Sequence, residues 1–297
     1  MDIEILEEMP SEIAEFFCEQ VLKRDWPDSM HAYYFIKNGF KWNKSNAPTS
    51  YKLYYVPSDI ENGTFLGIQY QVGNQYPVII VTYTFPGNED NYIRILSSTK
   101  RFNWQRTLLF QANVGRMVDV IKTTIKTKGL ESKLYADSIL KWMPANEAAQ
   151  LELKIPDDVF ISQLNKNHVD FMYSQWKHSD VYSKSDIEDS VIYNFGYGIF
   201  SKNNNDLLAW AMCGSYGGLT TLVVRSDKRN NGLGKLITKA VTKQMGLRGI
   251  SPHAIISRFN DISLTMFDKI GYNRKDPIPM LYFIVERYDN IQSKTQN

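Results

Sequence analysis

Cysteine and long apolar runs are what this sequence of 297 residues lacks most clearly. Its two cysteines, Cys18 and Cys213, are too few for a disulfide framework or a four-cysteine zinc site. The richest apolar stretch, residues 77–85, has the length of a strand and falls short of the roughly 18 residues that suggest a membrane-spanning helix. We therefore expect a reducing compartment, no metal site and no membrane partner.

An excess of charge of either sign is missing as well. Lys and Arg together number 34 and Asp and Glu 32, so the net charge of +2 gives no strong overall attraction to nucleic acid. The first 25 residues contain eight acidic and two basic side chains, which is the opposite of a signal or transit peptide. The expected location is the cytoplasm.

The length favours two domains, because a single hydrophobic core usually stops growing before this size. Two proline-containing turns, Met143-Pro144-Ala145 and Ile155-Pro156-Asp157, mark the boundary region. We therefore divide the chain into domains 1–145 and 146–297. Helical and extended segments occur in both, which predicts an α/β (α+β) fold class.

Apolar periodicity and turn residues predict the individual elements. In the first half, a helix starts near Pro10, strands cover residues 52–56, 64–72 and 77–85, and a second helix spans 104–126. The elements expected in the second half are a helix at 160–176, a hairpin of strands 195–201 and 207–213, a strand at 219–224, a helix from Leu233, a strand at 253–257, a short helix after Asn260 and a last strand at 280–287.

The segment that carries chemistry leads from the strand 219–224 into the helix at Leu233. Glycines at a helix entrance let a ligand approach the backbone, and the unpaired N–H groups there bind a phosphate or pyrophosphate. Residues 225–248 hold seven basic side chains and one acidic side chain. The alternative is a glycine-containing turn before a solvated basic helix. The candidate anion-binding residues are Arg229, Asn230, Asn231, Gly232, Leu233, Gly234 and Lys235.

The glycine spacing excludes two common phosphate loops. A P-loop needs four residues between its glycines and a following Gly-Lys-Ser/Thr, and a dinucleotide loop needs a third glycine where Ile237 stands. What remains is Arg229-x-x-Gly232-x-Gly234, which resembles the pyrophosphate loop of the GCN5-related N-acetyltransferase (GNAT) superfamily. The stretch from Asn260 to Lys269-Ile270-Gly271-Tyr272 resembles the second signature of that superfamily.

Within the superfamily the chain resembles the glycine N-acyltransferase family most, on His168-Val169-Asp170-Phe171 before the hairpin and Leu207-Leu208-Ala209-Trp210 within it. The resemblance implies an acyl-CoA N-acyltransferase fold with a mixed central sheet flanked by helices. It implies a degenerate N-terminal domain of related fold without its own cofactor loop. It also implies acyl-CoA or acetyl-CoA as co-substrate and glycine, another amino acid or a small amine as acceptor, and it admits a mitochondrial location.

By the same resemblance, the CoA pyrophosphate binds backbone N–H groups between Arg229 and Lys235. The acyl group passes directly to the amine without a covalent enzyme intermediate. The residues implied at the pantetheine arm are Leu222, Val223 and Val224, whose edge pairs with its amides, Asn260, which makes a polar contact, and Phe267, which flanks it.

Two positions depart from the family pattern. Phe267 replaces a tyrosine that protonates the leaving thiolate, and Gly218 replaces a glutamate base. The substitutes by location are Tyr216, His253, Ser215 and Tyr272, of which we select Tyr216 as the catalytic candidate, with a water molecule as the alternative.

These departures leave a second hypothesis open, a weak or inactive CoA-binding module of the same fold. A third hypothesis, a nucleic-acid binder that uses the basic helix, is opposed by the acidic N-terminus and by the missing RNA-binding motifs. The sequence does not indicate the oligomeric state.

Overall fold

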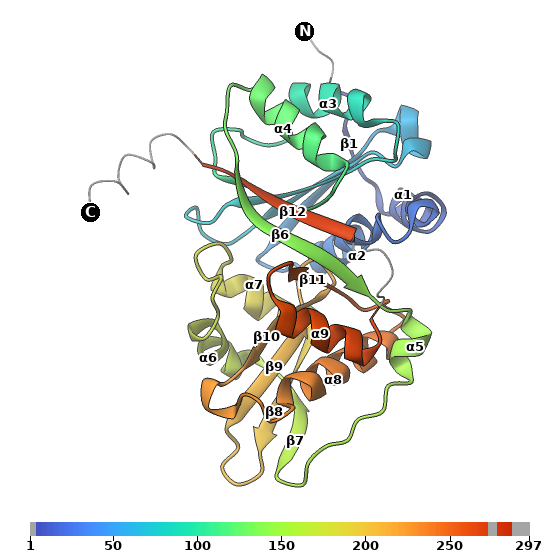
Figure 1. Ribbon diagram of the computed structural model, residues 1–297. Helices are drawn as coiled ribbons and strands as arrows, with labels where there is room; N and C mark the ends of the chain where they lie inside the picture. Colours follow the sequence, from blue (N-terminus) through green and yellow to red (C-terminus); the bar gives the residue numbers. More distant parts are fainter. Residues whose placement is uncertain (1–3, 273–277, 287–297) are drawn as a thin grey trace, which may run out of the picture. The chain divides into compact units, whose positions relative to one another are not determined.

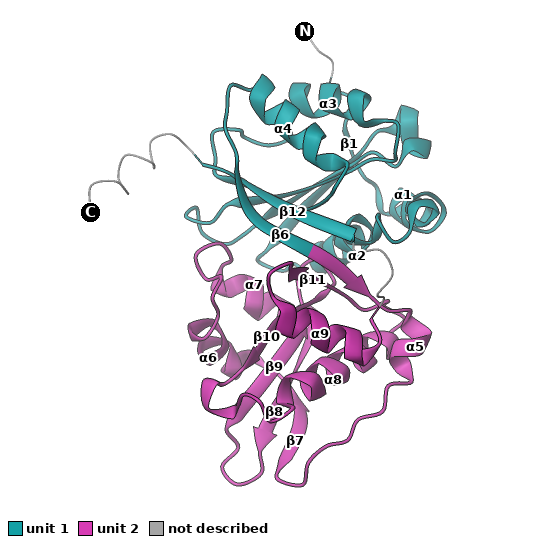
Figure 2. Cartoon of the chain, viewed as in Figure 1, with its two compact units in different colours: residues 1–138, 278–297 teal, residues 139–277 magenta. Residues whose placement is uncertain are grey.

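The computed structural model describes residues 4–272 and 278–286 and divides into two compact units (Figures 1 and 2). Unit 1 comprises residues 1–138 and 278–297, and unit 2 comprises residues 139–277. The division thus falls after residue 138, whereas the sequence prediction places it after residue 145. The last strand, expected in the second domain, belongs to unit 1 because it pairs with a strand of that unit.

Unit 1 is a mixed sheet with helices. Its elements are β1 (Glu7–Glu8), α1 (Ser11–Phe16), α2 (Met30–Lys44), β2 (Ser50–Tyr55), β3 (Phe65–Tyr70), β4 (Val78–Tyr83), α3 (Glu89–Ser98), β5 (Leu108–Val114), α4 (Met117–Thr127), β6 (Lys133–Trp142) up to Ser138, and β12 (Ile278–Val285). Strands β1 to β4 pair antiparallel in chain order. β5 lies parallel to β4 through the α3 crossover, and β12 lies antiparallel to β5, with β6 beside it.

Unit 2 contains a four-stranded antiparallel sheet with helices packed on both faces (Figure 1). Its elements are α5 (Ala145–Ala149), β7 (Val159–Gln163), α6 (Val169–Ser174), α7 (Lys184–Asp189), β8 (Phe195–Ser201), β9 (Leu207–Cys213), β10 (Leu219–Val224), α8 (Leu233–Leu247), β11 (His253–Ser257) and α9 (Asp261–Ile270). The strand order is β10-β9-β8-β7, so β10 is an edge strand. β11 lies outside this sheet, beside β6, whose last residues belong to unit 2.

Alternation along β9 explains how the helices are held to the two faces of this sheet. Ala209 and Ala211 point to one face, where the apolar stripe of α8 and residues of α9 form a buried cluster. Trp210 and Met212 point to the opposite face, where they pack with buried residues of α6 and α7. The small side chains lie under the long helix and the large ones under the short helices, so both faces of the sheet are covered.

Most of the predicted elements of the second half are confirmed. Strands 195–201, 207–213, 219–224 and 253–257 have the predicted bounds, and α8 begins at Leu233 as expected. A short helix, α9, follows Asn260. The last strand runs from Ile278 to Val285, and the predicted end at residue 287 lies outside the described residues.

The helix predicted over residues 104–126 is wrong in its first half. Residues 108–114 form β5, and helix α4 begins only at Met117. All seven residues of β5 are buried, so the strand has no polar alternation by which it could be told from a buried helix.

The helix predicted over residues 160–176 is also wrong in part. Residues 159–163 form β7, which pairs antiparallel with β8. Asn165 then starts a new turn, because its side chain accepts a hydrogen bond from the backbone N–H of Asn167 at 3.0 Å. Only residues 169–174 are α-helical after that turn.

Helix α2 is an element that the periodicity does not predict. Ten of its fifteen residues are buried, among them the uninterrupted run 30–36. A helix buried on most sides has no stripe that separates an apolar from a polar face. The signal on which the prediction depends is therefore absent.

Replacing Gly246 by alanine should destabilise unit 2, because α8 crosses α5 at this residue with backbone against backbone. A Cβ at residue 246 would lie 2.6 Å from the carbonyl oxygen of Ala145. We expect a loss of about 1–3 kcal/mol in the free energy of unfolding, measured by denaturant titration. The control is Gly115→Ala, whose Cβ would meet no atom within 4 Å. Equal losses in the two variants would contradict this packing.

Candidate functional site

The corner between β10 and α8 offers backbone N–H groups to an anion. Helix α8 begins at Leu233 after Gly232, its N-cap residue, and no side chain of the described chain caps it. The first N–H groups of a helix have no acceptor within the helix, and the helix dipole makes this end positive. No acidic side chain lies in the first turn. The corner therefore has the chemistry of a phosphate site.

The two glycines of this corner have different surroundings. Gly232 has a φ of +75°, a left-handed conformation that L side chains rarely adopt, and a Cβ there would meet no atom within 4 Å. Gly234 has ordinary backbone angles, but a Cβ there would lie 3.4 Å from a methyl of Val224. Gly232 thus sets the turn, whereas Gly234 lies in ordinary packing range of the end of β10.

The remaining residues predicted for the anion site have ordinary loop and helix positions. Arg229, Asn230 and Asn231 are exposed, and Asn230 also has a left-handed backbone, with a φ of +64°. The side chain of Leu233 is buried in the core, so only its backbone N–H faces the corner. Lys235 is exposed on the first turn of the helix.

A bulge interrupts β10 at Thr221 and Leu222, where the residues predicted to bind pantetheine begin. Thr220 pairs with Met212 and Val223 pairs with Trp210, so two residues of β10 stand against one residue of β9. The first of them, Thr221, has a φ of +52°, which is unusual for a β-branched residue.

Beyond the bulge, the outer edge of β10 has no strand partner within the described residues. Residues 222–224 are half-buried. β11 contacts β10 near its start, where Gly218 meets the ring of His253, but the two strands belong to different sheets. The edge formed by Leu222, Val223 and Val224 is therefore open to an extended ligand.

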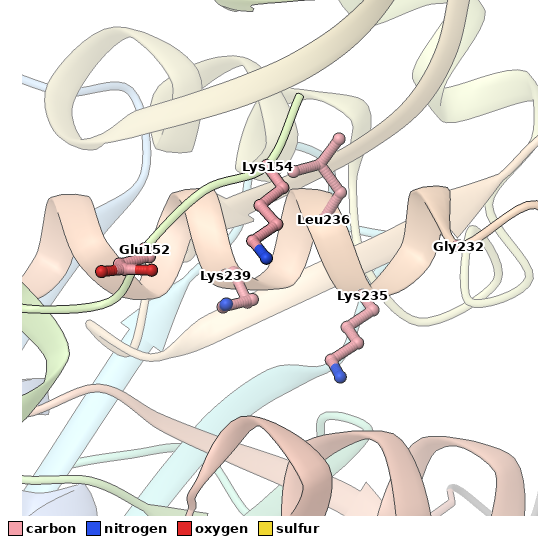
Figure 3. A pocket seen from close by; sticks show the side chains of 6 residues that line it. All are labelled: Glu152, Lys154, Gly232, Lys235, Leu236 and Lys239. Atoms are coloured by element: carbon pink, nitrogen blue, oxygen red, sulfur yellow. The ribbon is translucent and has the colours of Figure 1, made fainter. Parts of the chain in front are cut away.

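A basic hollow lies beside the first two turns of α8. Its volume is about 280 Å³. Figure 3 shows lysine side chains from the helix and from the neighbouring segment 152–154. Three ammonium groups and one carboxylate make the hollow positive. Its lining residues are Glu152, Lys154, Gly232, Lys235, Leu236 and Lys239.

The positive charge predicted for residues 225–248 is not all directed at this corner. Arg225 forms ion pairs of 3.0 Å with Asp206 and with Asp227, and its guanidinium holds the pKa of the Asp227 carboxyl below the usual range. Arg248, at the far end of α8, lies over the ring of Phe195 at 4.2 Å. The lysines of the hollow are the better candidates for a ligand.

The two residues predicted to contact pantetheine have different surroundings. Asn260 is exposed and is the N-cap of α9, where its Oδ1 accepts a hydrogen bond of 3.1 Å from Ser263 N–H. The Nδ2 group of Asn260 takes no part in this bond, so its N–H donors can bind a ligand. Phe267 is 2% exposed, and its ring packs edge-on against Tyr272 at 4.8 Å. Phe267 is thus a core residue here and does not flank an open groove.

Tyr216 lies in the tight turn between β9 and β10 and is half-buried. Its hydroxyl donates a hydrogen bond of 3.0 Å to the carbonyl of Leu219. Burial raises its pKa, so the phenol keeps its proton at neutral pH. The single O–H is directed at Leu219, so it would have to turn away from that carbonyl to donate to a developing negative charge, and the protonated phenol cannot act as a base at neutral pH.

The other substitutes suggested by the sequence are more deeply buried. The Tyr272 hydroxyl is 2.7 Å from the hydroxyl of Thr242, which ties α8 to the end of α9, and Ser215 is buried in the same turn as Tyr216. His253 is fully buried at the start of β11, and burial lowers its pKa to about 4. Its imidazole is therefore neutral at physiological pH.

Within residues 4–272 and 278–286, no group of three or more His, Cys, Asp or Glu side chains could hold a metal ion. In the same part of the chain, no helix is long and apolar enough to cross a membrane.

Comparison with known proteins bears on the fold of the chain. Residues 196–278, from β8 to the first residue of β12, match the family model of the FR47-like proteins. The chain is similar to a Drosophila protein solved by structural genomics, with a TM-score of 0.85 and 16% identity over 96% of this chain and 99% of that one. No curated protein matches the sequence.

Two further structures extend the comparison. A GCN5-related N-acetyltransferase from Kribbella flavida has a TM-score of 0.52 and 12% identity over 77% of this chain and 89% of its own. A tandem GNAT protein from the clavulanic acid biosynthesis pathway has a TM-score of 0.53 and 11% identity over 95% and 98%. This chain has the GNAT fold. The closer resemblance to the glycine N-acyltransferases stays a prediction.

Charge and backbone conformation at Gly232 can be separated by two substitutions. Gly232→Asp should lower the affinity for CoA by more than tenfold, because a carboxylate would stand at the positive helix end where a phosphate binds. Gly232→Asn, which tolerates a positive φ and adds no charge, should lower it far less. Isothermal titration calorimetry measures both affinities. Equal losses would assign the effect to the backbone alone, and unchanged affinities would exclude the corner as the phosphate site.

Proposed function

We propose that this chain is an acyl-CoA-dependent N-acyltransferase that transfers an acetyl or other acyl group to the amine of a small molecule, with glycine or another amino acid as the candidate acceptor. The single observation that carries the proposal is the open edge of β10 leading to the uncapped, glycine-led start of α8. A ligand in which a diphosphate carries an extended arm with amide groups fits both features. CoA is such a ligand, and the match of residues 196–278 supports this choice.

The phosphates of CoA would bind at the corner and in the basic hollow. The backbone N–H groups of the first turn, at Leu233, Gly234 and Lys235, would donate to the pyrophosphate. Lys239 of this helix and Lys154 of the neighbouring segment both line the hollow, and they would neutralise the remaining phosphate charge.

The pantetheine arm would continue along the edge of β10. Its two amides alternate donors and acceptors as a peptide does, so the backbone of residues 222–224 can pair with them in the manner of an added strand. Nδ2 of Asn260 is a further donor for this arm. The thioester would then reach the bulge, where the ladder with β9 is interrupted and backbone N–H groups can polarise its carbonyl.

The reaction would be a direct transfer. The amine nitrogen attacks the thioester carbon, the new C–N bond forms, the C–S bond breaks, and the amine loses one proton while the thiolate gains one. A thiol of pKa about 8.5 is a good leaving group, which makes the missing tyrosine at Phe267 tolerable. Tyr216, which stays protonated, is the candidate donor to the thiolate.

Unit 1 lacks the features that make this corner attractive to an anion. Helix α3 follows β4 as α8 follows β10, but its first turn carries Glu89 and Asp90. The backbone N–H of Gly87 donates a hydrogen bond of 2.8 Å to Glu89. Carboxylates at this end of a helix repel phosphate, so we assign one CoA site per chain, in unit 2, and regard unit 1 as a degenerate domain of related fold.

Two measurements test the proposal. Calorimetry should find one saturable CoA site per chain, and acetyl-CoA with a panel of amines should release free thiol. CoA that fails to bind at millimolar concentration would refute the proposal. Saturable binding without turnover on a broad panel of acyl-CoAs and amines would instead favour the inactive CoA-binding module, which gains no support from the comparisons.

The lysines of the hollow should contribute to CoA affinity through charge. Lys154→Ala and Lys239→Ala should each weaken CoA binding roughly tenfold at low salt, or about 1.4 kcal/mol, and the difference should shrink as ionic strength rises. Lys202→Ala, in the turn after β8, is the matched control. Dephospho-CoA distinguishes the phosphates: if the hollow holds the ribose phosphate, the lysine variants bind dephospho-CoA as well as the parent does. Full affinity of both variants for CoA would exclude the hollow.

A further inference from the structure

The sequence contains three asparagines that are followed directly by glycine, in the pairs Asn38-Gly39, Asn62-Gly63 and Asn231-Gly232. Such a pair is chemically unstable in water. The backbone nitrogen of the glycine can attack the side-chain carbonyl carbon of the asparagine, and no Cβ on the glycine obstructs the approach. The attack requires that the nitrogen is not held in a hydrogen bond and that the chain has room to close a ring.

The fold protects the first two pairs. Asn38-Gly39 is buried inside helix α2, where each N–H group is bonded to a carbonyl of the preceding turn. The second pair ends a short 3₁₀ helix, and the N–H of Gly63 donates a hydrogen bond of 3.1 Å to the carbonyl of Ile60. The carboxamide of Asn62 is held as well, because its Nδ2 donates to the carboxylate of Asp59. Neither pair meets the requirements for ring closure.

The third pair meets both requirements. Asn231 and Gly232 are exposed and lie outside helix and strand, immediately before α8. Within residues 4–272 and 278–286, neither the Asn231 side chain nor the Gly232 N–H has a hydrogen-bond partner. A Cβ at Gly232 would meet no atom within 4 Å, so the space around this backbone is open. The unprotected pair is thus the one that stands at the candidate anion site.

We propose that Asn231 is a site of spontaneous deamidation that switches off the CoA corner. The modification itself follows from the geometry of the pair, and its effect on CoA rests on the proposed function. The Gly232 nitrogen attacks Cγ of Asn231 and forms a new C–N bond. The bond from Cγ to Nδ2 breaks, and Nδ2 leaves as ammonia with the proton of the Gly232 N–H. Water then opens the ring at either carbonyl, which leaves aspartate or isoaspartate at residue 231.

Both products place a carboxylate where the phosphate would bind. Residue 231 immediately precedes the N-cap of α8, and a carboxylate at this end of a helix is attracted by the dipole and by the free N–H groups. Isoaspartate also lengthens the main chain by one carbon before Gly232, which displaces a turn set by a φ of +75°. An anion that the chain itself carries then competes with CoA for the N–H groups of the first turn.

The first test measures the modification without any ligand. Peptide mapping by mass spectrometry follows the three asparagines in one sample of the folded chain kept at mildly alkaline pH. Asn231 should convert at least about tenfold faster than Asn38 and Asn62, which are internal controls with the same following residue. In guanidinium chloride the three rates should converge, because the protection of the two controls comes from the fold. Equal rates at Asn231 and Asn62 in the folded chain would overturn the assignment.

The second test measures the effect on CoA binding by calorimetry. Asn231→Asp supplies the aspartate product in pure form and should bind CoA about tenfold more weakly than the fresh parent. Its melting temperature should be unchanged or higher, because a carboxylate stabilises this end of a helix. A lower melting temperature would instead attribute the loss of affinity to damage of the fold and overturn the competition.

Aged samples connect the two measurements. The parent should lose CoA sites in proportion to the converted fraction of Asn231. Asn231→Gln should keep the affinity of its own fresh sample, because the longer side chain closes the corresponding ring far more slowly. CoA present during ageing should slow conversion at Asn231 and leave Asn38 and Asn62 unaffected, since the bound pyrophosphate would occupy this corner.

The outcomes distinguish this inference from the proposed function. A fresh protein that binds no CoA refutes the proposed function and the effect on binding, whereas the three conversion rates still decide whether Asn231 is modified. A fresh protein that binds CoA and keeps its full affinity after Asn231 has converted refutes the switch alone. Selective conversion of Asn231, with a matching loss of CoA sites in the parent and none in Asn231→Gln, supports it.

Discussion

The bulge in β10 is the constraint on which the candidate site depends. It sets Thr221 and Leu222 against a single residue of β9 and holds Thr221 at a φ of +52°, which costs on the order of 1–3 kcal/mol. A regular strand would avoid this cost. The bulged strand leaves the last residues of β10 half-buried at an edge of the sheet. No other strand of the described chain pairs with this edge. The open edge and the helix start that follows it are the two features a long ligand can use together.

The corner itself could be predicted from the sequence because its causes are local. A glycine in a left-handed conformation, a second glycine against the preceding strand and an apolar stripe from Leu233 are properties of neighbouring residues. The strands of the hairpin were predictable for a local reason too, since the polar turn at residues 202–206 separates two runs of strand length. The count of basic residues in 225–248 predicted the anion site less well. Arg225, for example, is paired with Asp206, which lies in the turn between β8 and β9.

What the sequence could not predict depends on partners far along the chain. β5 is buried on both faces, so its apolar residues look like a helix stripe until β4 and β12 are placed beside it. β12 belongs to unit 1 because it pairs with β5, and its own residues do not indicate this. Phe267 shows the same limit at the site: its position in a motif suggested a ligand contact, whereas its burial against Tyr272 makes it part of the core.

The two units can be compared element by element, because both contain a strand, a helix and a second strand in the same order. These are β4, α3 and β5 in unit 1 and β10, α8 and β11 in unit 2. In unit 1 the two strands form a parallel ladder from Val78 to Ile80, and carboxylates stand at the start of the helix between them. In unit 2 the strands share no ladder, and the helix start is free of acidic side chains. Each difference alone would weaken an anion site in unit 1. A ligand that needs both an open edge and a positive helix end can therefore discriminate between two similar halves of one chain by backbone geometry and charge.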